Sequence, residues 1–356
     1  MNILRFNKII ALALLFPVSF LACTKSDPVD DQQYKGWVVG QAENGFGTIL
    51  STSNDGLTWT RQGSQSQAAG VDLYDIHGLD QNNAWAVGGI FKGYGLILHT
   101  TDGGTTWFRQ GTALQVPNVR LFSVHVVDEL TIWVAGEKGA LLVSKDGGNT
   151  WTPVNVSSLP PTTFYAITSF GTKSIWTVGT AVDTSMTTDT VGLIFYSSDA
   201  GITWGRQGGG ELFPLKFFDV SAGNDSIVFI AGSNSVYKSS DGGKVWFKVL
   251  NLANRNMNGI CAVDVENVWA VGDRDGIFHS TTGGASWDST SPSLTGFRLM
   301  GVTVADVNRV WIVGTPTSGI GKGNIIYSRN AGNTWFIENS PVDVGFRRVS
   351  FASARR

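Results

Sequence analysis

The sequence predicts an all-β fold, a seven-bladed β-propeller whose C-terminal strand completes the N-terminal blade. Two motifs alternate along the chain, seven copies of each, and together they contain all 13 tryptophans. Their period of about 40–50 residues is typical of a four-stranded propeller blade. The 44 glycines suit many tight turns. Beyond the N-terminus, no segment shows the sustained 3.6-residue apolar period of a helix.

The N-terminal segment predicts export. Arg5 and Lys8 precede an apolar run at residues 9–21, which is too short to span a membrane and fits a signal peptide. The run ends in Phe20-Leu21-Ala22-Cys23, which resembles a bacterial lipobox, where a small residue precedes the cysteine that receives the lipid. Ordinary signal cleavage near Ala22, with Cys23 incidental, is the alternative.

Three domains follow from this interpretation. Residues 1–22 are expected to be a signal peptide, and residues 23–33 a polar tether lipidated at Cys23. Residues 34–356 are expected to form the propeller. The predicted location is the bacterial cell envelope, as an exported, membrane-anchored lipoprotein that lies at the outer membrane or faces the periplasm.

The first repeated motif ends in tryptophan and reads Thr101-Asp102-Gly103-Gly104-Thr105-Thr106-Trp107 in its second copy. It resembles the Asp-box, or bacterial neuraminidase repeat. The side chain of the Asp is expected to accept backbone hydrogen bonds across a hairpin, while the tryptophan packs beneath it. Its acceptor residues are Asn54, Asp102, Asp146, Asp199, Asp241 and Asn330, and its tryptophans are Trp59, Trp107, Trp151, Trp204, Trp246, Trp287 and Trp335. Because Asn replaces Asp in two copies, a structural role is favoured over a catalytic one.

The second motif, Trp-x-Val-Gly in most copies, marks the second strand of each blade. In one unit we expect strands at 73–79, 84–87, 96–100 and 106–109, with the intervening segment 88–95 as a loop. First strands alternate between a face of large residues, such as Tyr74 and Ile76, and a face of small or polar residues, such as Asp75 and His77. We expect the large face to pack between neighbouring blades.

The ends of the chain predict how the ring closes. The domain begins at a second strand, with Trp37, and ends after a first strand at 346–351. Aligning 346–351 with 297–302, through the shared Phe-Arg dipeptide, places Val349 with Tyr74. Pairing of the last strand with the first blade would remove two open sheet edges.

Over its mature length the chain resembles the photosystem II stability/assembly factor family, through its Trp-x-Val-Gly pattern and Asp-boxes. The resemblance implies a protein-binding scaffold with no catalysis and no cofactor. It implies a protein partner in or at a membrane. The family is also associated with an arginine-rich patch, although that arginine run is not reproduced residue for residue here.

A basic rim is the candidate binding site. Connections after second and fourth strands are longer and more varied than the other turns, which marks one side of the ring as the working face. Cations precede or begin the first strands of five blades on that side, at Arg120, Lys216, Arg255, Arg298 and Arg347. We expect this rim to dock an acidic segment of the partner. Solvated charges at strand ends are the alternative.

Other functions are less favoured by the sequence. A net charge of −2 does not suit nucleic-acid binding. A glycan-binding module remains an alternative, as does an Asp-box glycoside hydrolase of the sialidase or xyloglucanase type. Hydrolysis needs two carboxylates about 5–10 Å apart, and Asp75 and Asp219 are expected to be too separated for an obvious pair. His77 and His125 align in adjacent blades, but no third metal ligand is apparent, so no metal site is predicted.

Overall fold

A computed structural model describes residues 33–62, 70–156, 162–182, 190–208, 215–290, 292, 295–319 and 321–352. The predicted signal peptide, Cys23 and residues 24–32 of the tether lie outside the described residues. The compact unit begins at Gln33. Within the described part of the chain, no helix has the length and apolar character needed to cross a membrane.

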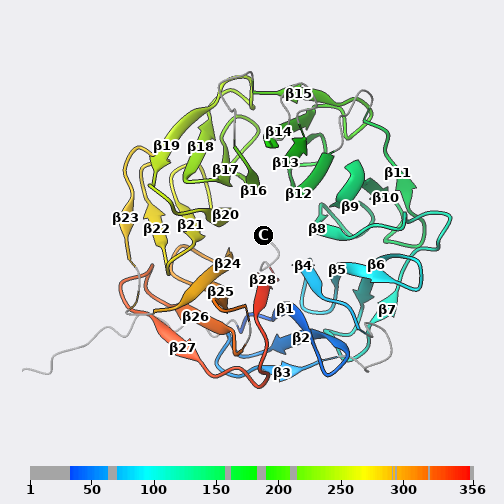
Figure 1. Cartoon of the computed structure of the whole chain (residues 1–356), viewed down its shortest axis with the longest axis horizontal. Helices are drawn as coiled ribbons and strands as arrows, with labels where there is room; N and C mark the ends of the chain where they lie inside the picture. The colour runs from blue at the N-terminus through cyan, green and yellow to red at the C-terminus, as the bar shows by residue number, and fades with distance from the viewer. Residues whose placement is uncertain are drawn as a thin grey trace, which may run out of the picture. The chain divides into compact units, whose positions relative to one another are not determined.

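The described strands form seven four-stranded antiparallel sheets arranged around an axis (Figure 1). Each sheet is one blade, so the predicted seven-bladed propeller is confirmed. Blades one to three are β28 (Phe346–Phe351), β1 (Gly36–Glu43), β2 (Phe46–Thr52) and β3 (Thr60–Arg61); β4 (Leu73–Gly78), β5 (Ala84–Phe91), β6 (Tyr94–Thr100) and β7 (Phe108–Arg109); and β8 (Leu121–Val126), β9 (Ile132–Gly136), β10 (Leu141–Ser144) and β11 (Thr152–Pro153).

The remaining blades repeat the same order from the axis outward. They are β12 (Thr162–Phe170), β13 (Ser174–Val182), β14 (Thr190–Ser197) and β15 (Gly205–Gln207); β16 (Phe217–Ala222), β17 (Val228–Gly232), β18 (Ser235–Ser239) and β19 (Phe247–Asn251); β20 (Met257–Ala262), β21 (Val268–Gly272), β22 (Ile277–Ser280) and β23 (Asp288–Ser289); and β24 (Phe297–Val304), β25 (Val310–Pro316), β26 (Asn324–Ser328) and β27 (Phe336–Glu338). One short 3-10 turn, η1 (Glu137–Gly139), joins β9 to β10.

The C-terminal strand closes the ring as predicted. In Figure 1 β28 lies beside β1, and the two strands pair antiparallel with Val38 opposite Val349. Phe351 also stacks on Trp311 of blade seven, with ring centroids 3.7 Å apart. The last strand therefore connects the first blade to the seventh.

The register expected for the closing strand is wrong by two residues. Phe346 lies opposite Gly40, as Leu299 lies opposite Gly314 and Leu73 opposite Gly88. Phe346 is thus equivalent to Leu299, not to Phe297. Arg347 consequently shares the position of Tyr74, and Arg348 shares the position of Asp75.

Each first strand carries a β-bulge, which the alternation of large and small residues did not predict. The register shifts at Tyr74 in β4 and at the six equivalent positions of the other blades. Because a bulge adds one residue to the strand, it reorients the side chains on either side of it. Ile76 packs between blades at 3% exposure as expected. Tyr74 instead is half-buried and lines the axis.

The predicted loop at 88–95 is also wrong. β5 runs to Phe91 and β6 begins at Tyr94, so a tight hairpin extends the blade on this side of the ring. β1 and β2 are extended in the same way, to Glu43 and from Phe46. Paired strands replace loops here because Lys92-Gly93 and Asn44-Gly45 adopt the positive φ angles of a two-residue turn.

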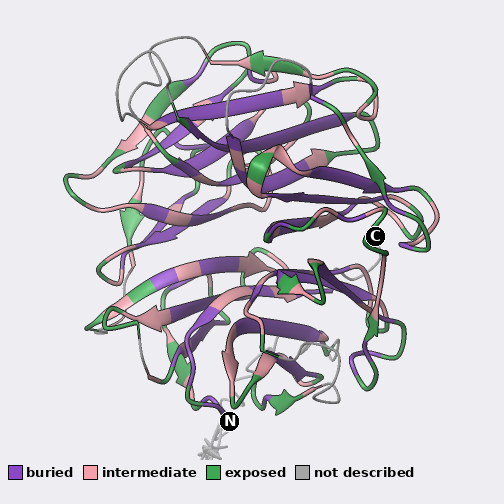
Figure 2. Cartoon of the chain, turned by 45° about the vertical axis from the view of Figure 1, so that its right-hand side comes forward, coloured by how far each residue is buried: buried purple, intermediate pink, exposed green. Residues whose placement is uncertain are grey.

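The core lies between adjacent blades, where Figure 2 shows buried strand centres and exposed turns. Trp37 of blade one, for example, packs with Leu73, Ile76 and Trp107 of blade two. The six tryptophans of second strands are all between 0% and 2% exposed. Among the motif-one tryptophans, Trp204, Trp287 and Trp335 are only partly buried. Burial of these aromatic faces, with the aliphatic side chains packed around them, stabilises the ring.

The motif-one aspartates lie in the hairpin turns between third and fourth strands. Asp146 accepts hydrogen bonds from the amide of Thr150 at 2.8 Å and the hydroxyl of Thr150 at 2.6 Å. Asn330 accepts the corresponding bond from the amide of Thr334 at 2.8 Å. The glycine of the turn is required at Gly201, where φ is +82° and an added Cβ would lie 2.2 Å from Trp133.

Candidate binding site at the channel mouth

The bulged residues of the seven first strands surround a cavity on the side of the ring that bears the connections after second and fourth strands. We call that side the loop side, and the opposite one the turn side. The cavity, here the mouth cavity, has a volume of about 240 Å³. Its lining residues are Tyr74, Phe122, Tyr165, Phe218, Asn258, Met300, Arg347 and Arg348. Sequence alternation assigned most of them to the core between blades.

Four aromatic rings form a continuous wall on blades two to five. The ring centroids of Tyr74 and Phe122 are 4.9 Å apart, those of Phe122 and Tyr165 are 5.5 Å apart, and those of Tyr165 and Phe218 are 6.2 Å apart. Adjacent rings are tilted, as aromatic pairs prefer. The wall is therefore a pre-formed apolar surface at the centre of the loop side.

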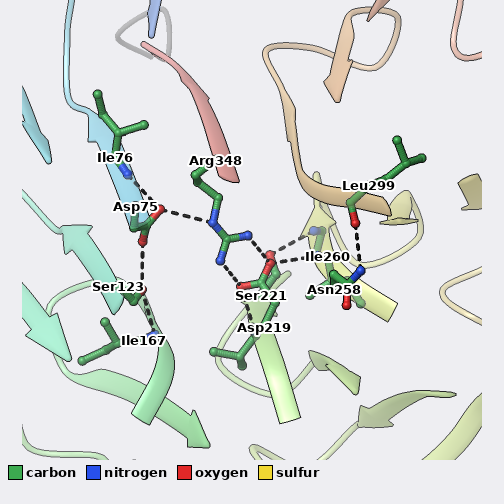
Figure 3. A network of polar contacts seen from close by, with 12 residues as sticks. Asp75, Ile76, Ser123, Ile167, Asp219, Ser221, Asn258, Ile260, Leu299 and Arg348 are labelled. Carbon is green, nitrogen blue, oxygen red and sulfur yellow. Dashed lines mark hydrogen bonds and ion pairs between the residues drawn. The ribbon is translucent and has the colours of Figure 1, made fainter. Parts of the chain in front are cut away.

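Arg348 lies at the base of the mouth cavity and joins two blades that are not neighbours (Figure 3). Its Nε is 3.2 Å from an Asp75 carboxylate oxygen, and its two Nη atoms are 2.8 and 3.2 Å from the Asp219 carboxylate. The prediction that Asp75 and Asp219 are too separated for an obvious pair is corrected by this finding. The two carboxylates share one guanidinium because β28 places Arg348 between them.

Backbone donors also bind both carboxylates. Asp75 accepts hydrogen bonds from the Val124 amide and the Ser123 hydroxyl, both at 2.9 Å. Asp219 accepts one from the Ile260 amide at 2.9 Å. Each carboxylate thus connects its own blade to the next one as well as to Arg348. A buried charge with this many partners is satisfied, and it has little capacity left for a substrate.

Burial and the neighbouring charges shift the pKa values of both Asp75 and Arg348. Burial raises the pKa of the Asp75 carboxyl, and the nearby Arg348 opposes that rise. Burial alone would lower the pKa of Arg348, but the carboxylates of Asp219 and Asp75 outweigh it and raise the pKa. Arg348 is therefore permanently charged, as a guanidinium normally is.

The predicted rim cations differ in their surroundings. Arg120 pairs with Glu137 at 2.6 Å and Arg298 pairs with Asp273 at 3.1 Å. In these pairs the arginine side chains are 53% and 52% exposed, whereas the acids are 21% and 22% exposed. Each acid thus holds its guanidinium from below while the cationic group faces solvent.

The other three rim residues do not all occupy the expected position. Lys216 comes directly before Phe217, the first buried residue of its first strand, as Arg120 comes before Leu121 and Arg298 before Leu299, and it is exposed. Arg255 lies one residue farther from its strand and is half-buried near Asp275. Arg347 lies two residues beyond the rim position of its own blade. It lines the mouth cavity, where it bonds Asp72 at 2.8 Å. The rim cations are therefore not equivalent, and Gly345 fills the rim position of blade one.

A second cavity, the inner cavity, lies along the axis beyond Arg348 and has a volume of about 240 Å³. Its lining includes Asp75, Asp219, His77, His125 and Cys261. The rings of His77 and His125, which align in adjacent blades, are 5.0 Å apart. Burial lowers the pKa of His77 to about 4. Among the described residues, no group of three or more acidic, histidine or cysteine side chains is placed to hold a metal ion.

Sequence reasoning missed Arg348 because of the register error. The correct signal is a large apolar residue followed three positions later by a second apolar residue. Leu73 and Ile76 have this spacing, as do Phe217 and Val220, and Phe346 and Val349 match it. The Phe-Arg dipeptide shared by 297–298 and 346–347 led instead to an alignment that is wrong by two residues.

The chain is similar to a family profile, to a curated protein and to several solved structures. The family profile described as "Photosynthesis system II assembly factor YCF48" matches residues 69–210. The "Photosystem II assembly lipoprotein Ycf48" of Synechococcus sp. (strain CC9902) is 25% identical over 217 residues, which are 59% of this chain. The chain spans 58% of the length of that curated relative.

Solved structures show the same fold. The structure titled "YCF48 bound to D1 peptide" has a TM-score of 0.56 at 19% identity and covers 75% of this chain and 82% of its own. The GH74 xyloglucanase from Xanthomonas campestris has a TM-score of 0.61 at 15% identity, covering 89% of this chain and 56% of its own. Structural likeness at these identities shows the fold alone. The chain is therefore similar to photosystem II assembly factors over part of its sequence, and it shares their propeller fold.

Proposed function

We propose that this chain is a non-catalytic scaffold of the bacterial cell envelope, anchored by a lipid on Cys23, that binds a membrane-associated protein on its loop side. The observation that carries the proposal is the match to the YCF48 family, one of whose solved structures is titled as bound to a D1 peptide. The curated relative is named a lipoprotein, which supports the anchor.

The geometry of the rim supports docking of an acidic segment. Arg120 and Arg298 present exposed guanidiniums above less exposed acids, and Lys216 adds a third exposed cation. Cations on a rigid scaffold accelerate association with an acidic partner and fix its orientation. Because individual exposed ion pairs contribute little to stability, we assign these cations to binding rather than to folding.

The hydrogen bonds and ion pairs of the two carboxylates on the axis, Asp75 and Asp219, support a non-catalytic role. Asp75 and Asp219 are bound to Arg348 and to backbone amides, which removes the free acid and base that glycoside hydrolysis requires. A glycan-binding module is the alternative that the aromatic wall favours, because sugars stack on aromatic faces. It predicts capture of an oligosaccharide without a protein.

The proposal is tested by cross-linking the lipidated protein in its native envelope and recovering bound proteins. The test variant is Arg120→Gln/Lys216→Gln/Arg298→Gln, and the matched control is Lys145→Gln/Lys173→Gln/Lys244→Gln on the turn side. We expect one stoichiometric partner with the wild type and the control, and its loss with the rim variant. Equal recovery of the partner with both variants would show that the rim is not the binding site. Retention on a glycan array without any protein partner would favour the glycan-binding module.

A further inference from the structure

We infer that the mouth cavity binds one apolar side chain of the protein partner, presented by a segment with acidic residues on both sides of it. The inference rests on the proposed function, since it names the chemistry of the docking segment. It is carried by the combination of an apolar pocket at the centre of the loop side and exposed cations around it.

The mouth cavity has the size and lining of a side-chain pocket. Its volume of about 240 Å³ exceeds the roughly 150 Å³ of an apolar cavity that holds benzene. Tyr74, Phe122, Tyr165 and Phe218 supply ring surface on one half, and Met300 supplies an adaptable thioether opposite. A single ring or a leucine-type side chain is therefore the group that fits.

Arg348 closes the inner end of the mouth cavity. Of the described residues that line the two axial cavities, Arg348 is the one common to both. Because Asp75 and Asp219 hold its guanidinium from two sides, the side chain cannot move aside cheaply. A group that enters from the loop side stops there, as an anchoring residue does in the centre of an interface.

The charges in the cavity are already paired, so the pocket selects an uncharged group. One Nη of Arg347 bonds Asp72, and the guanidinium lies 4.8 Å from the ring of Tyr74. The buried Nε of Arg347 has no hydrogen-bond partner in the described structure, so the pocket offers one donor but no unpaired charge. The Asn258 amide donates to Asp273 at 3.1 Å and to the carbonyl of Leu299 at 2.9 Å. A charged side chain placed here would lose its hydration without gaining a free counter-ion, whereas an apolar one loses nothing.

The rim directly adjoins this pocket. The guanidinium of Arg120 lies 5.9 Å from the ring of Phe122, and Arg298 reaches Asn258 through Asp273. A peptide that inserts one side chain at the axis must place its neighbouring residues over these cations. Acidic neighbours complement them, which gives the motif acidic–apolar–acidic.

The test uses two synthetic peptides, Glu-Glu-Phe-Glu-Glu and Glu-Glu-Ser-Glu-Glu, each capped and labelled through a flexible linker for fluorescence anisotropy. We expect the wild type to bind the Phe peptide at least about tenfold more tightly than the Ser peptide, since burying a phenylalanine has that effect. Salt should weaken both peptides together and leave their ratio unchanged, because the ratio measures apolar burial.

The protein variants locate the effect. Phe122→Ala removes part of the wall, and Met300→Trp fills the pocket without removing any ring; each should bring the Phe/Ser ratio close to one. Phe247→Ala, whose side chain is 64% exposed on β19, is the matched control and should keep the wild-type ratio. Thermal melts confirm that each variant is folded.

The outcomes separate this inference from the proposed function. A ratio near one in the wild type, an unchanged ratio in both Phe122→Ala and Met300→Trp, or competition by cellotetraose would overturn the apolar pocket. If neither peptide binds while the rim-dependent partner is still recovered from the envelope, the pocket fails and the scaffold stands. If the rim variant loses neither peptides nor partner, the proposed function fails whatever the ratio.

Discussion

At the scale of single residues, Arg348 has the most consequential contacts in the described part of the chain. It arrives on the last strand, yet it bonds Asp75 of blade two and Asp219 of blade five. Three blades therefore meet at one guanidinium. A side chain that is 15% exposed and paired on two sides is a buried ion triad, whose members depend on one another.

We predict that Arg348→Met destabilises the fold by about 3–5 kcal/mol, because it leaves two carboxylates near each other without their cation. Urea unfolding followed by tryptophan fluorescence measures this loss. Arg348→Met/Asp75→Asn/Asp219→Asn should recover a large part of it, since removing the whole triad leaves no uncompensated charge. A single variant as stable as the wild type, or a triple variant no better than the single one, would contradict this account of the triad.

At the scale of elements, the repeats made most of the fold predictable. The turn residues of motif one and the Trp-x-Val-Gly strands define the order of strands without any long-range information. The bulge in each first strand was not predictable, because it follows from how the strand bends around the axis rather than from local periodicity. The register of β28 was missed for a related reason. The anchor residue Phe346 is recognised only when the bulge is known.

We predict that a chain lacking residues 346–356 is no longer a monomer that unfolds cooperatively. The deletion exposes the edge of β1 and removes Phe351 from Trp311 and Trp59. An unpaired edge beside uncovered aromatic surface favours aggregation. Size-exclusion chromatography and thermal melts measure the outcome, with deletion of 353–356 as the control. A monomeric truncated chain that melts within a few degrees of the full chain would show that closure contributes little.

At the scale of the whole molecule, the candidate site arises from the ring itself. The bulged residue of every first strand lines the mouth cavity, together with Arg348 of blade one, so no local stretch of sequence displays the site. Rim cations such as Arg120 were found because they recur at one position of the repeat. Their acidic partners, Glu137 in η1 and Asp273 directly after β21, were not predicted.

We predict that acid destabilises the ring between about pH 6.5 and pH 4. Burial lowers the pKa of His77 to about 4 and that of His125 well below its usual value, and the neighbouring His77 lowers the latter further. The unfolded chain therefore binds protons in this range that the folded chain does not, so stability falls as pH falls. The raised pKa of Asp75 acts in the opposite sense and offsets part of the loss.

The measurement is the urea midpoint at pH 7 and pH 4.5 for the wild type and for His77→Gln/His125→Gln. We expect the wild type to lose on the order of 1–3 kcal/mol more than the variant over this interval. Equal losses in the two proteins would mean that these rings stay hydrated, and that the inner cavity is open to protons.

The central claim is that the loop side of the ring is the surface that binds a protein. Two leucines beside blade three allow a matched test: Leu114 is 97% exposed on the loop side, and Leu130 is 59% exposed on the turn side. A photo-reactive amino acid is placed at each in turn, and the protein is irradiated in its native envelope. The account predicts a discrete protein adduct from position 114 and none from position 130; an adduct from position 130 alone would contradict it.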